Sequence, residues 1–304
     1  MLKGVVRRAG GGRYEIDTEE GVFEAVLRGR LKLEERVGDR VVVGDHVEIA
    51  EPGGQNQPWT IEAVEERGSA LLRRAPGKAP RPKVIVANVD QVMIVFAVAR
   101  PKPHLRMLDR FLVLCESSGL EPVIVANKVD ISGLEAAHSL FGLYERIGYR
   151  VLYTAAATGE GVEALRENIC GKVSALTGPS GVGKSSLLNR VQPGLGLRVG
   201  RISEAVQKGR HTTVTAELIA LDCGGYVADT PGLRELGLWG VDEAELGLSF
   251  PEFEPYLGRC RYANSCTHSH EPECAVIAAV KSGEIAESRY DSYLRLLKGE
   301  EEDG

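Results

Sequence analysis

Long uninterrupted hydrophobic runs are missing from this chain of 304 residues. The longest apolar stretch, residues 84–99, is broken by Asn88, Asp90 and Gln91, whereas a membrane-spanning helix needs about 20 consecutive apolar residues. The first ten residues, MLKGVVRRAG, also lack the apolar core that marks a secretory signal peptide. We therefore expect a cytoplasmic protein without a membrane segment.

The chain has no excess of positive charge and no low-complexity tract long enough to indicate disorder. Its 37 Lys and Arg residues and 43 Asp and Glu residues give a net charge of −6, so there is no overall attraction to nucleic acid. Basic residues are nevertheless concentrated in residues 67–83, which contain no acid. This strip is either a solvated linker or an element that contacts phosphates, and the sequence favours neither. Its basic residues are Arg67, Arg73, Arg74, Lys78, Arg81 and Lys83.

Hydrophobic patterning divides the chain into three parts. Residues 1–70 alternate between apolar and polar positions in short segments separated by turn residues, which predicts a small antiparallel barrel. Five or so strands favour an OB-like barrel, although an SH3-like barrel gives a similar pattern. Residues 71–250 alternate strands with helices, which predicts an α/β domain with a parallel sheet. Residues 251–304 end in two helical segments.

The phosphate-loop motif is the strongest chemical signal. The segment GPSGVGKSS follows the predicted strand 173–177 and precedes a predicted helix that starts at Lys184. Glycines let backbone N–H groups turn toward a β-phosphate, the lysine reaches β and γ oxygens, and the Ser185 hydroxyl is a ligand for Mg²⁺. The motif predicts nucleotide binding by Gly178, Pro179, Ser180, Gly181, Val182, Gly183, Lys184, Ser185 and Ser186.

A second motif selects the base. Asn127, Lys128 and Asp130 form NKVD at the end of the predicted strand PVIVA, which is where ligands bind open parallel sheets. The carboxylate of Asp130 can accept hydrogen bonds from guanine N1–H and from its exocyclic amine. Adenine has a lone pair at N1 and would be repelled. The sequence therefore predicts guanine, and with the phosphate loop it predicts GTP or GDP as the ligand.

Two further segments complete a nucleotide switch. DTPG follows the predicted strand YVA, so that Asp229 can hold Mg²⁺ through water and the Gly232 N–H can meet the γ-phosphate. In the preceding KGRHTTVT, Thr212 or Thr213 can ligate Mg²⁺ when the γ-phosphate is present. Thr213 is the preferred magnesium ligand, although the pattern does not separate it from its neighbour.

The order of these motifs is unusual, because NKVD precedes the phosphate loop whereas ordinary GTPases begin with that loop. The chain is therefore expected to be circularly permuted. An N-terminal barrel, NKVD, GPSGVGKSS, GRHTT, DTPG and a Cys-rich tail together resemble the RsgA (YjeQ) family of ribosome small subunit-dependent GTPases. The resemblance covers nearly the whole chain. It implies a circularly permuted α/β P-loop GTPase domain at 71–250, an OB-like RNA-binding barrel at 1–70 and a zinc-binding helical domain at 251–304.

The resemblance also assigns residues. Ala155 and Ala156 occupy the loop behind the guanine, where the usual pattern is Ser-Ala, so a hydroxyl is lost at Ala155. The residue after DTPG is Leu233, whereas Ras-type GTPases place a water-orienting glutamine there. His211 is the nearest side chain able to orient the water, and its family counterpart has that role. Contact of His211 with RNA or solvent alone is the competing interpretation.

The cysteine cluster predicts a structural zinc site. Cys260, Cys266, His268 and Cys274 match the family's metal knuckle, except that five residues rather than four separate the first two cysteines. Three thiolates and one imidazole leave no open coordination position, so one Zn²⁺ would stabilise the fold and not activate water. His270 is a rival ligand. The remaining cysteines, scattered through apolar surroundings, are Cys115, Cys170 and Cys223.

The resemblance implies a GTPase that binds the small (30S) ribosomal subunit and its 16S rRNA, and that assists late maturation of the subunit. Slow intrinsic hydrolysis, stimulated by the subunit, is expected because neither a glutamine nor an arginine finger is evident. We expect a monomer that needs Mg²⁺ and Zn²⁺. The alternative is an RNA-binding module that uses GTP as a structural ligand and hydrolyses it negligibly.

Overall fold

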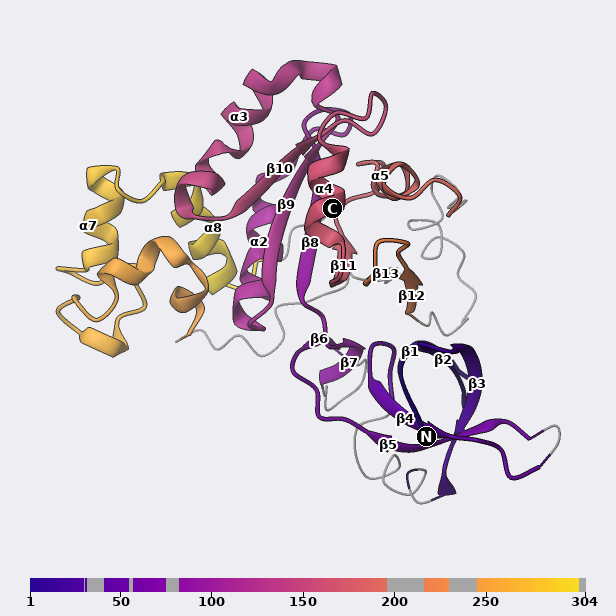
Figure 1. Ribbon diagram of the computed structural model, residues 1–304. Coiled ribbons are helices and arrows are strands. Elements are labelled where there is room, and N and C mark those ends of the chain that lie inside the picture. Colours follow the sequence, from indigo (N-terminus) through magenta and orange to yellow (C-terminus); the bar gives the residue numbers. More distant parts are fainter. Residues whose placement is uncertain are drawn as a thin grey trace.

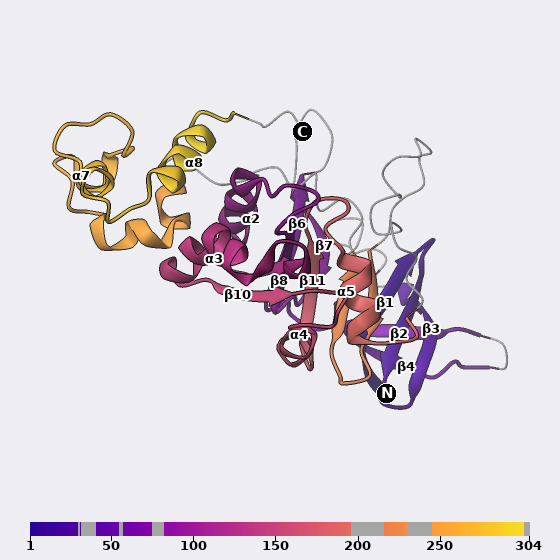
Figure 2. The same ribbon diagram turned by 90° about the horizontal axis from the view of Figure 1, so that it is seen from above.

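A computed structural model gives the fold of the chain and describes residues 1–29, 31, 41–54, 57–74, 82–195, 216–229 and 245–300. A barrel, an α/β unit and a C-terminal unit follow one another along the chain. The barrel and the C-terminal unit lie at opposite ends of the α/β unit in both views (Figures 1 and 2). No helix of the described part is long and apolar enough to cross a bilayer.

The N-terminal barrel has five strands whose order explains how it closes. The strands are neighbours in the order β1-β2-β3-β5-β4, and β4 pairs back with β1. All pairs are antiparallel except β3 with β5. This closed five-stranded arrangement confirms the OB-like prediction. The strands are β1 (Leu2–Gly10), β2 (Arg13–Thr18), β3 (Gly21–Leu27), β4 (His46–Ala50) and β5 (Trp59–Val64).

The sheet of the α/β unit has the order β10-β9-β8-β11-β13-β12. The first five strands are parallel, as predicted, but β12 is antiparallel to β13. A tight turn joins these two strands, and a turn without a crossover helix can connect only antiparallel neighbours. The strands are β8 (Gln91–Ala97), β9 (Glu121–Asn127), β10 (Arg150–Thr154), β11 (Val173–Thr177), β12 (Glu217–Ala220) and β13 (Tyr226–Asp229).

Helices cover both faces of this sheet, so its central strand β8 is buried along its whole length. Val92, Ile94 and Phe96 pack with the first pair of helices, and Met93 and Val95 pack with the second pair on the opposite face. This division follows the two-residue alternation of a strand. The first pair is α2 (Leu105–Ser117) and α3 (Val129–Ile147), and the second pair is α4 (Val162–Ile169) and α5 (Lys184–Val191).

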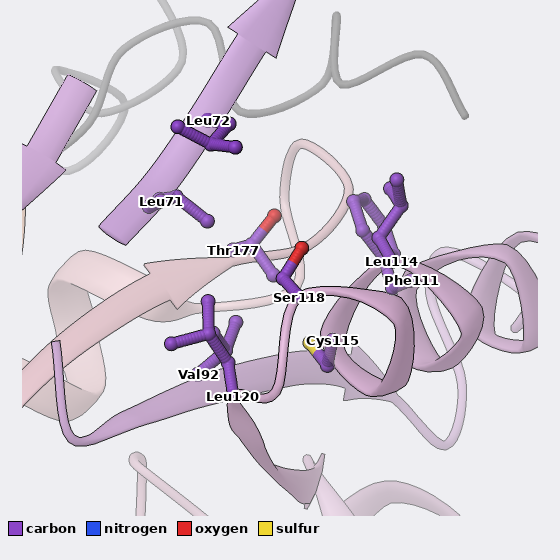
Figure 3. Close-up of a pocket in the computed structure, with 9 residues that line it drawn as sticks. All are labelled: Leu71, Leu72, Val92, Phe111, Leu114, Cys115, Ser118, Leu120 and Thr177. Carbon is purple, nitrogen blue, oxygen red and sulfur yellow. The ribbon is translucent and has the colours of Figure 1, made fainter. Parts of the chain in front are cut away.

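A hairpin of β6 (Ala70–Arg74) and β7 (Pro82–Ala87) connects the barrel to the α/β unit. Leu71 belongs to the same hydrophobic core as Phe111 of α2. Side chains of the hairpin, of α2 and of the last residue of β11, Thr177, line a small apolar pocket here (Figure 3). The barrel and the α/β unit also share one continuous sheet, because β1 pairs with β12 at Arg8 and Glu217.

The first residue of the basic strip has a structural partner. Arg67 donates from Nε to Asp45 Oδ1 at 2.7 Å and from Nη2 to Asp45 Oδ2 at 2.9 Å, and the Asp45 side chain is fully buried. Of the other five basic residues, Lys78 and Arg81 lie outside the described residues, and only the backbone of Arg73, Arg74 and Lys83 is described. Arg67 therefore ties the segment between β5 and the hairpin to Asp45, directly before β4.

The C-terminal unit packs against α2. Its hydrophobic core contains Phe250, Phe253 and Tyr293 together with Val113 of α2. Its two predicted helices are present as α7 (Ala275–Ser282) and α8 (Glu287–Leu297). Three short 3-10 turns precede them, and these are η2 (Leu246–Ser249), η3 (Pro251–Tyr256) and η4 (Ala263–Ser265).

The three cysteines outside the cluster have two different environments. Cys115 is buried in the core of the α/β unit, as its place on the apolar face of α2 predicts. Cys170 and Cys223 form a disulfide with Cα atoms 5.4 Å apart. It joins the end of α4 to the turn between β12 and β13, and no spacing signal along the chain predicts this pairing.

Candidate nucleotide site and metal centre

The phosphate loop connects β11 to α5, and two of its glycines are required because neighbouring atoms leave no room for a side chain. Gly178 has φ of +128°, and a Cβ there would lie 2.0 Å from the Val95 carbonyl oxygen. Gly183 has φ of +102°, and a Cβ there would lie 2.4 Å from Asn127 Nδ2. Only glycine adopts these angles and fits these spaces. The motif's glycines therefore let the loop pass directly beside β8 and β9.

Lys184 and Ser185 begin α5, where the positive end of the helix dipole and free N–H groups favour an anion. The Lys184 side chain is buried, and its Nζ donates to the carbonyl oxygens of Gly178 and Pro179, at 2.7 Å each. Ser185 is also buried. The motif's cation and hydroxyl are therefore held inside the loop, at the position where β and γ oxygens and Mg²⁺ could bind.

NKVD contacts this loop directly. Asn127, the last residue of β9, donates from Nδ2 to the Val182 carbonyl at 2.8 Å. Lys128 donates from Nζ to the Gly181 carbonyl at 2.6 Å. Asp130 lies exposed in the first turn of α3. Two motifs more than 50 residues apart thus meet at the carboxyl ends of β9 and β11.

The loop after β10 approaches the same asparagine. Asn127 Oδ1 accepts from Thr154 Oγ1 at 3.1 Å and from the Ala156 N–H at 3.2 Å. Ala155 is buried, and its N–H donates to the Glu160 carbonyl at 2.9 Å. Sequence reasoning did not single out Thr154, since a single threonine at a strand end has no distinguishing spacing. Asn127 therefore links the phosphate loop and the loop expected behind the base.

The switch segments fall largely outside the described residues. His211, Thr212, Thr213, Gly232 and Leu233 all lie there. Only the backbone of Asp229 is described, as the last residue of β13. Because β13 pairs in parallel with β11, Asp229 lies at the sheet edge where β11 enters the phosphate loop.

The predicted metal ligands form a compact cluster. Cys260, Cys266, His268 and Cys274 are buried, and their ligand atoms all lie within 4.8 Å of one another. His268 Nδ1 lies 3.5 Å from the sulfurs of Cys260 and Cys274, and these two sulfurs are 3.7 Å apart. A tetrahedral Zn²⁺ with ordinary bond lengths separates two sulfurs by about 3.8 Å and a sulfur from a nitrogen by about 3.5 Å. The donor set therefore fits zinc.

The rival ligand lies outside this cluster. His270 is exposed, and its Nδ1 lies 2.8 Å from Ser269 Oγ. Burial lowers the pKa of His268, which favours the neutral imidazole that a metal needs. Burial also raises the pKa of the Cys266 thiol, so binding Zn²⁺ would displace its proton. The geometry therefore favours His268.

Glu271 shapes the ligand loop, although sequence reasoning did not find it. Its carboxylate accepts from the backbone N–H groups of Thr267 at 2.7 Å, Ser269 at 3.0 Å and His270 at 3.1 Å. Burial opposes its ionisation, but these hydrogen bonds and one from the Thr267 hydroxyl outweigh burial and hold the pKa of Glu271 well below its usual range. Glu271 therefore fixes the backbone on both sides of His268.

Comparison with known proteins decides the family. The model of the RsgA GTPase family matches residues 64–239. A relative from Gemmatimonas aurantiaca is 50% identical over 294 residues, which cover 96% of this chain and 95% of the relative. The chain belongs to the RsgA GTPase family. A second relative, from Moorella thermoacetica, is 48% identical and covers 97% of this chain and 96% of its own length. Both relatives are named small ribosomal subunit biogenesis GTPase RsgA.

Solved structures agree with this family. The crystal structure of YjeQ from Thermotoga maritima matches with a TM-score of 0.79 and 37% identity, covering 98% of both chains. YloQ, described as a circularly permuted GTPase, matches with a TM-score of 0.75 and 29% identity over 98% of this chain and 94% of its own. The order of NKVD and phosphate loop is therefore a genuine permutation, and this member of the RsgA family is a GTPase.

Proposed function

We propose that this RsgA-family GTPase binds GTP where the phosphate loop and NKVD meet, and that it acts on the small ribosomal subunit. The observation that carries the site is the pair of hydrogen bonds from Asn127 and Lys128 onto the loop carbonyls of Val182 and Gly181. They hold a guanine-selecting motif at a fixed position relative to a phosphate-binding loop. One nucleotide can therefore occupy both.

Each part of the site has a proposed role. Asp130 accepts the hydrogen bonds of the guanine N1–H and amine, and a backbone N–H of the loop that contains Ala155 and Ala156 donates to guanine O6. Gly178, Pro179, Ser180, Gly181, Val182, Gly183 and Ser186 line the phosphates, and Lys184 neutralises charge on the β and γ oxygens. Mg²⁺ would be held by Ser185, by Thr213 or Thr212, and through water by Asp229, and it would stabilise charge that develops during phosphoryl transfer.

Water activation is assigned to His211. Leu233 has no polar group with which to orient water, and His211 lies next to the two candidate magnesium threonines in the sequence. We assign it the positioning of water in line with the γ-phosphate, with the Gly232 N–H contacting that phosphate. Because no glutamine serves this purpose, intrinsic turnover would be slow and would depend on a partner that orders this segment.

The proposed partner is the small ribosomal subunit with its 16S rRNA, in the cytoplasm, and the protein acts as a monomer. Relatives that cover almost the whole chain are named for biogenesis of that subunit. The OB-like barrel suits RNA, since such barrels bind oligonucleotides on one face. One Zn²⁺ held by Cys260, Cys266, His268 and Cys274 would stabilise the C-terminal unit without taking part in hydrolysis.

Phosphate release from GTP, measured with and without purified small subunits, tests this function. The GTPase role predicts slow release alone and clear stimulation by the subunit. A protein that uses GTP only as a structural ligand would show neither, and the family relationship does not favour that alternative. His211→Ala should lose the stimulation while it retains GDP binding. Equal stimulated turnover in the variant and the parent would remove His211 from the mechanism.

A further inference from the structure

Arg190 joins the phosphate-loop helix to the loop expected behind the guanine. It lies in the last turn of α5, six residues after Lys184. Its Nε donates to the Ala156 carbonyl at 2.9 Å, and its Nη2 donates to the Ala157 carbonyl at 2.8 Å. One planar guanidinium therefore holds two successive peptide groups of the loop after β10.

Few other hydrogen bonds attach the loop to neighbouring elements, although Ala155 also packs in the core of the α/β unit. Residues 155–157 are alanines, so their side chains form no hydrogen bonds. Both backbone hydrogen bonds of Ala155 stay within the loop. Its N–H donates to the Glu160 carbonyl, and its carbonyl accepts from the Gly159 N–H. The Ala156 N–H donates to Asn127. A serine hydroxyl, which the family pattern places at residue 155, is absent, so backbone bonds to Asn127 and Arg190 hold the loop.

The geometry points to Arg190 as a positioning residue for the base, an inference that rests on the proposed nucleotide site. α5 begins at the phosphate-binding residues, and its last turn holds the loop that contacts guanine. A two-pronged guanidinium fixes orientation as well as distance, which a single point charge does not. The residues that bind the phosphates and the residue that orients the base-binding loop are therefore parts of one helix. The orientation of that loop at guanine O6 depends on Arg190.

A simple charge effect would look similar in a binding assay, since any cation near the site attracts a nucleotide. Arg190→Lys separates the two, because lysine keeps the charge but cannot span both carbonyls as the fork does. Arg190→Ala removes both charge and fork at an exposed helix position where alanine is well tolerated. Arg166→Ala is the matched control, because Arg166 lies on the neighbouring helix α4 and pairs there with Glu163 at 3.7 Å.

Equilibrium titrations with three nucleotides give the test. GDP is compared with inosine diphosphate, which lacks the 2-amino group facing Asp130, and with 6-thioguanosine diphosphate, whose sulfur replaces O6 and accepts hydrogen bonds weakly. We expect Arg190→Ala to weaken GDP binding about three- to tenfold, as loss of a partly screened charge-assisted contact does. The preference for GDP over the thio analogue should shrink, and its preference over inosine diphosphate should not change. Arg190→Lys should resemble Arg190→Ala, and Arg166→Ala should resemble the parent.

Three results would overturn the inference. These are parent-like binding by Arg190→Ala, full recovery of GDP affinity in Arg190→Lys, and loss of affinity that is equal for all three nucleotides. The melting temperature without nucleotide shows whether a variant is folded, and a folded parent that binds no guanine nucleotide would instead refute the proposed function. A folded Arg190→Ala variant that loses its preference for GDP over the 6-thio analogue, and keeps its preference over inosine diphosphate, would establish the role.

Discussion

Replacing Arg289 with leucine should weaken the attachment of the C-terminal unit to the GTPase domain. The Arg289 side chain is 1% exposed and lies in α8. It donates to Asp109 of α2 at 2.6 Å and to Glu252 of η3 at 2.6 Å, and its guanidinium lies 4.6 Å from the centre of the Phe250 ring. Tyr144 of α3 also donates to Asp109, at 2.8 Å. This network is a buried polar contact between the two units.

The expected loss follows from what the substitution leaves behind. Burial opposes the charge on Asp109 and raises its pKa, and Arg289 is the principal group that counteracts this effect. Without the guanidinium, the carboxylates of Asp109 and Glu252 stay buried and lose their cation. Removal of one partner from a buried ion pair costs about 3–5 kcal/mol. A loss of about 3 kcal/mol corresponds to roughly a 100-fold change in an opening equilibrium.

Hydrogen exchange of the α8 amides measures this opening. Exchange in α8 should accelerate by about two orders of magnitude in Arg289→Leu, while the barrel strands exchange as in the parent. Arg295→Leu is the matched control on the same helix, because Arg295 is 41% exposed and its pair with Asp291, at 3.2 Å, should be worth at most about 1 kcal/mol. If the two variants exchange equally, the buried network does not hold the units together.

Three further outcomes are expected. Asp130→Asn should weaken GDP binding at least about tenfold and improve binding of xanthosine diphosphate, whose C2 oxygen can accept from the amide. Competition titrations that show an unchanged preference for GDP over xanthosine diphosphate would contradict the assignment. Cys266→Ser should lower the zinc content, measured by elemental analysis, below one per chain, whereas His270→Ala should keep one zinc. Loss of zinc in His270→Ala would make His270 a ligand in place of His268. Glu271→Gln should be less stable than the parent at neutral pH. Because the folded-state pKa of Glu271 is depressed, its contribution is present above an unfolded value of about 4.3 and is lost as pH falls below it, so pH-dependent melting should show the two proteins converging in acid.

The sequence predicted features that depend on local spacing or periodicity. Alternation of apolar residues gave the OB-like barrel and the strand–helix units, because a strand repeats every two residues and a helix about every 3.6. The phosphate loop could be recognised because its glycines, Lys184 and Ser185 act together within eight residues. The metal knuckle could be recognised because three cysteines and a histidine fall within fifteen residues. The order of motifs was sufficient to predict the permutation.

The tertiary structure alone decided which distant residues meet. Arg190 is 34 positions from Ala156, Cys170 is 53 from Cys223, and Arg289 is 180 from Asp109. No spacing rule connects such pairs, and a lone arginine or cysteine has the same local pattern on a solvated surface as in a buried contact. The preference for His268 over His270 came from spacing and the family pattern, and the folded loop supports it because His268 lies among the three cysteines. Motifs such as the phosphate loop and the metal knuckle are thus encoded in neighbouring residues. The contacts between separate elements and units depend on packing that brings remote segments together.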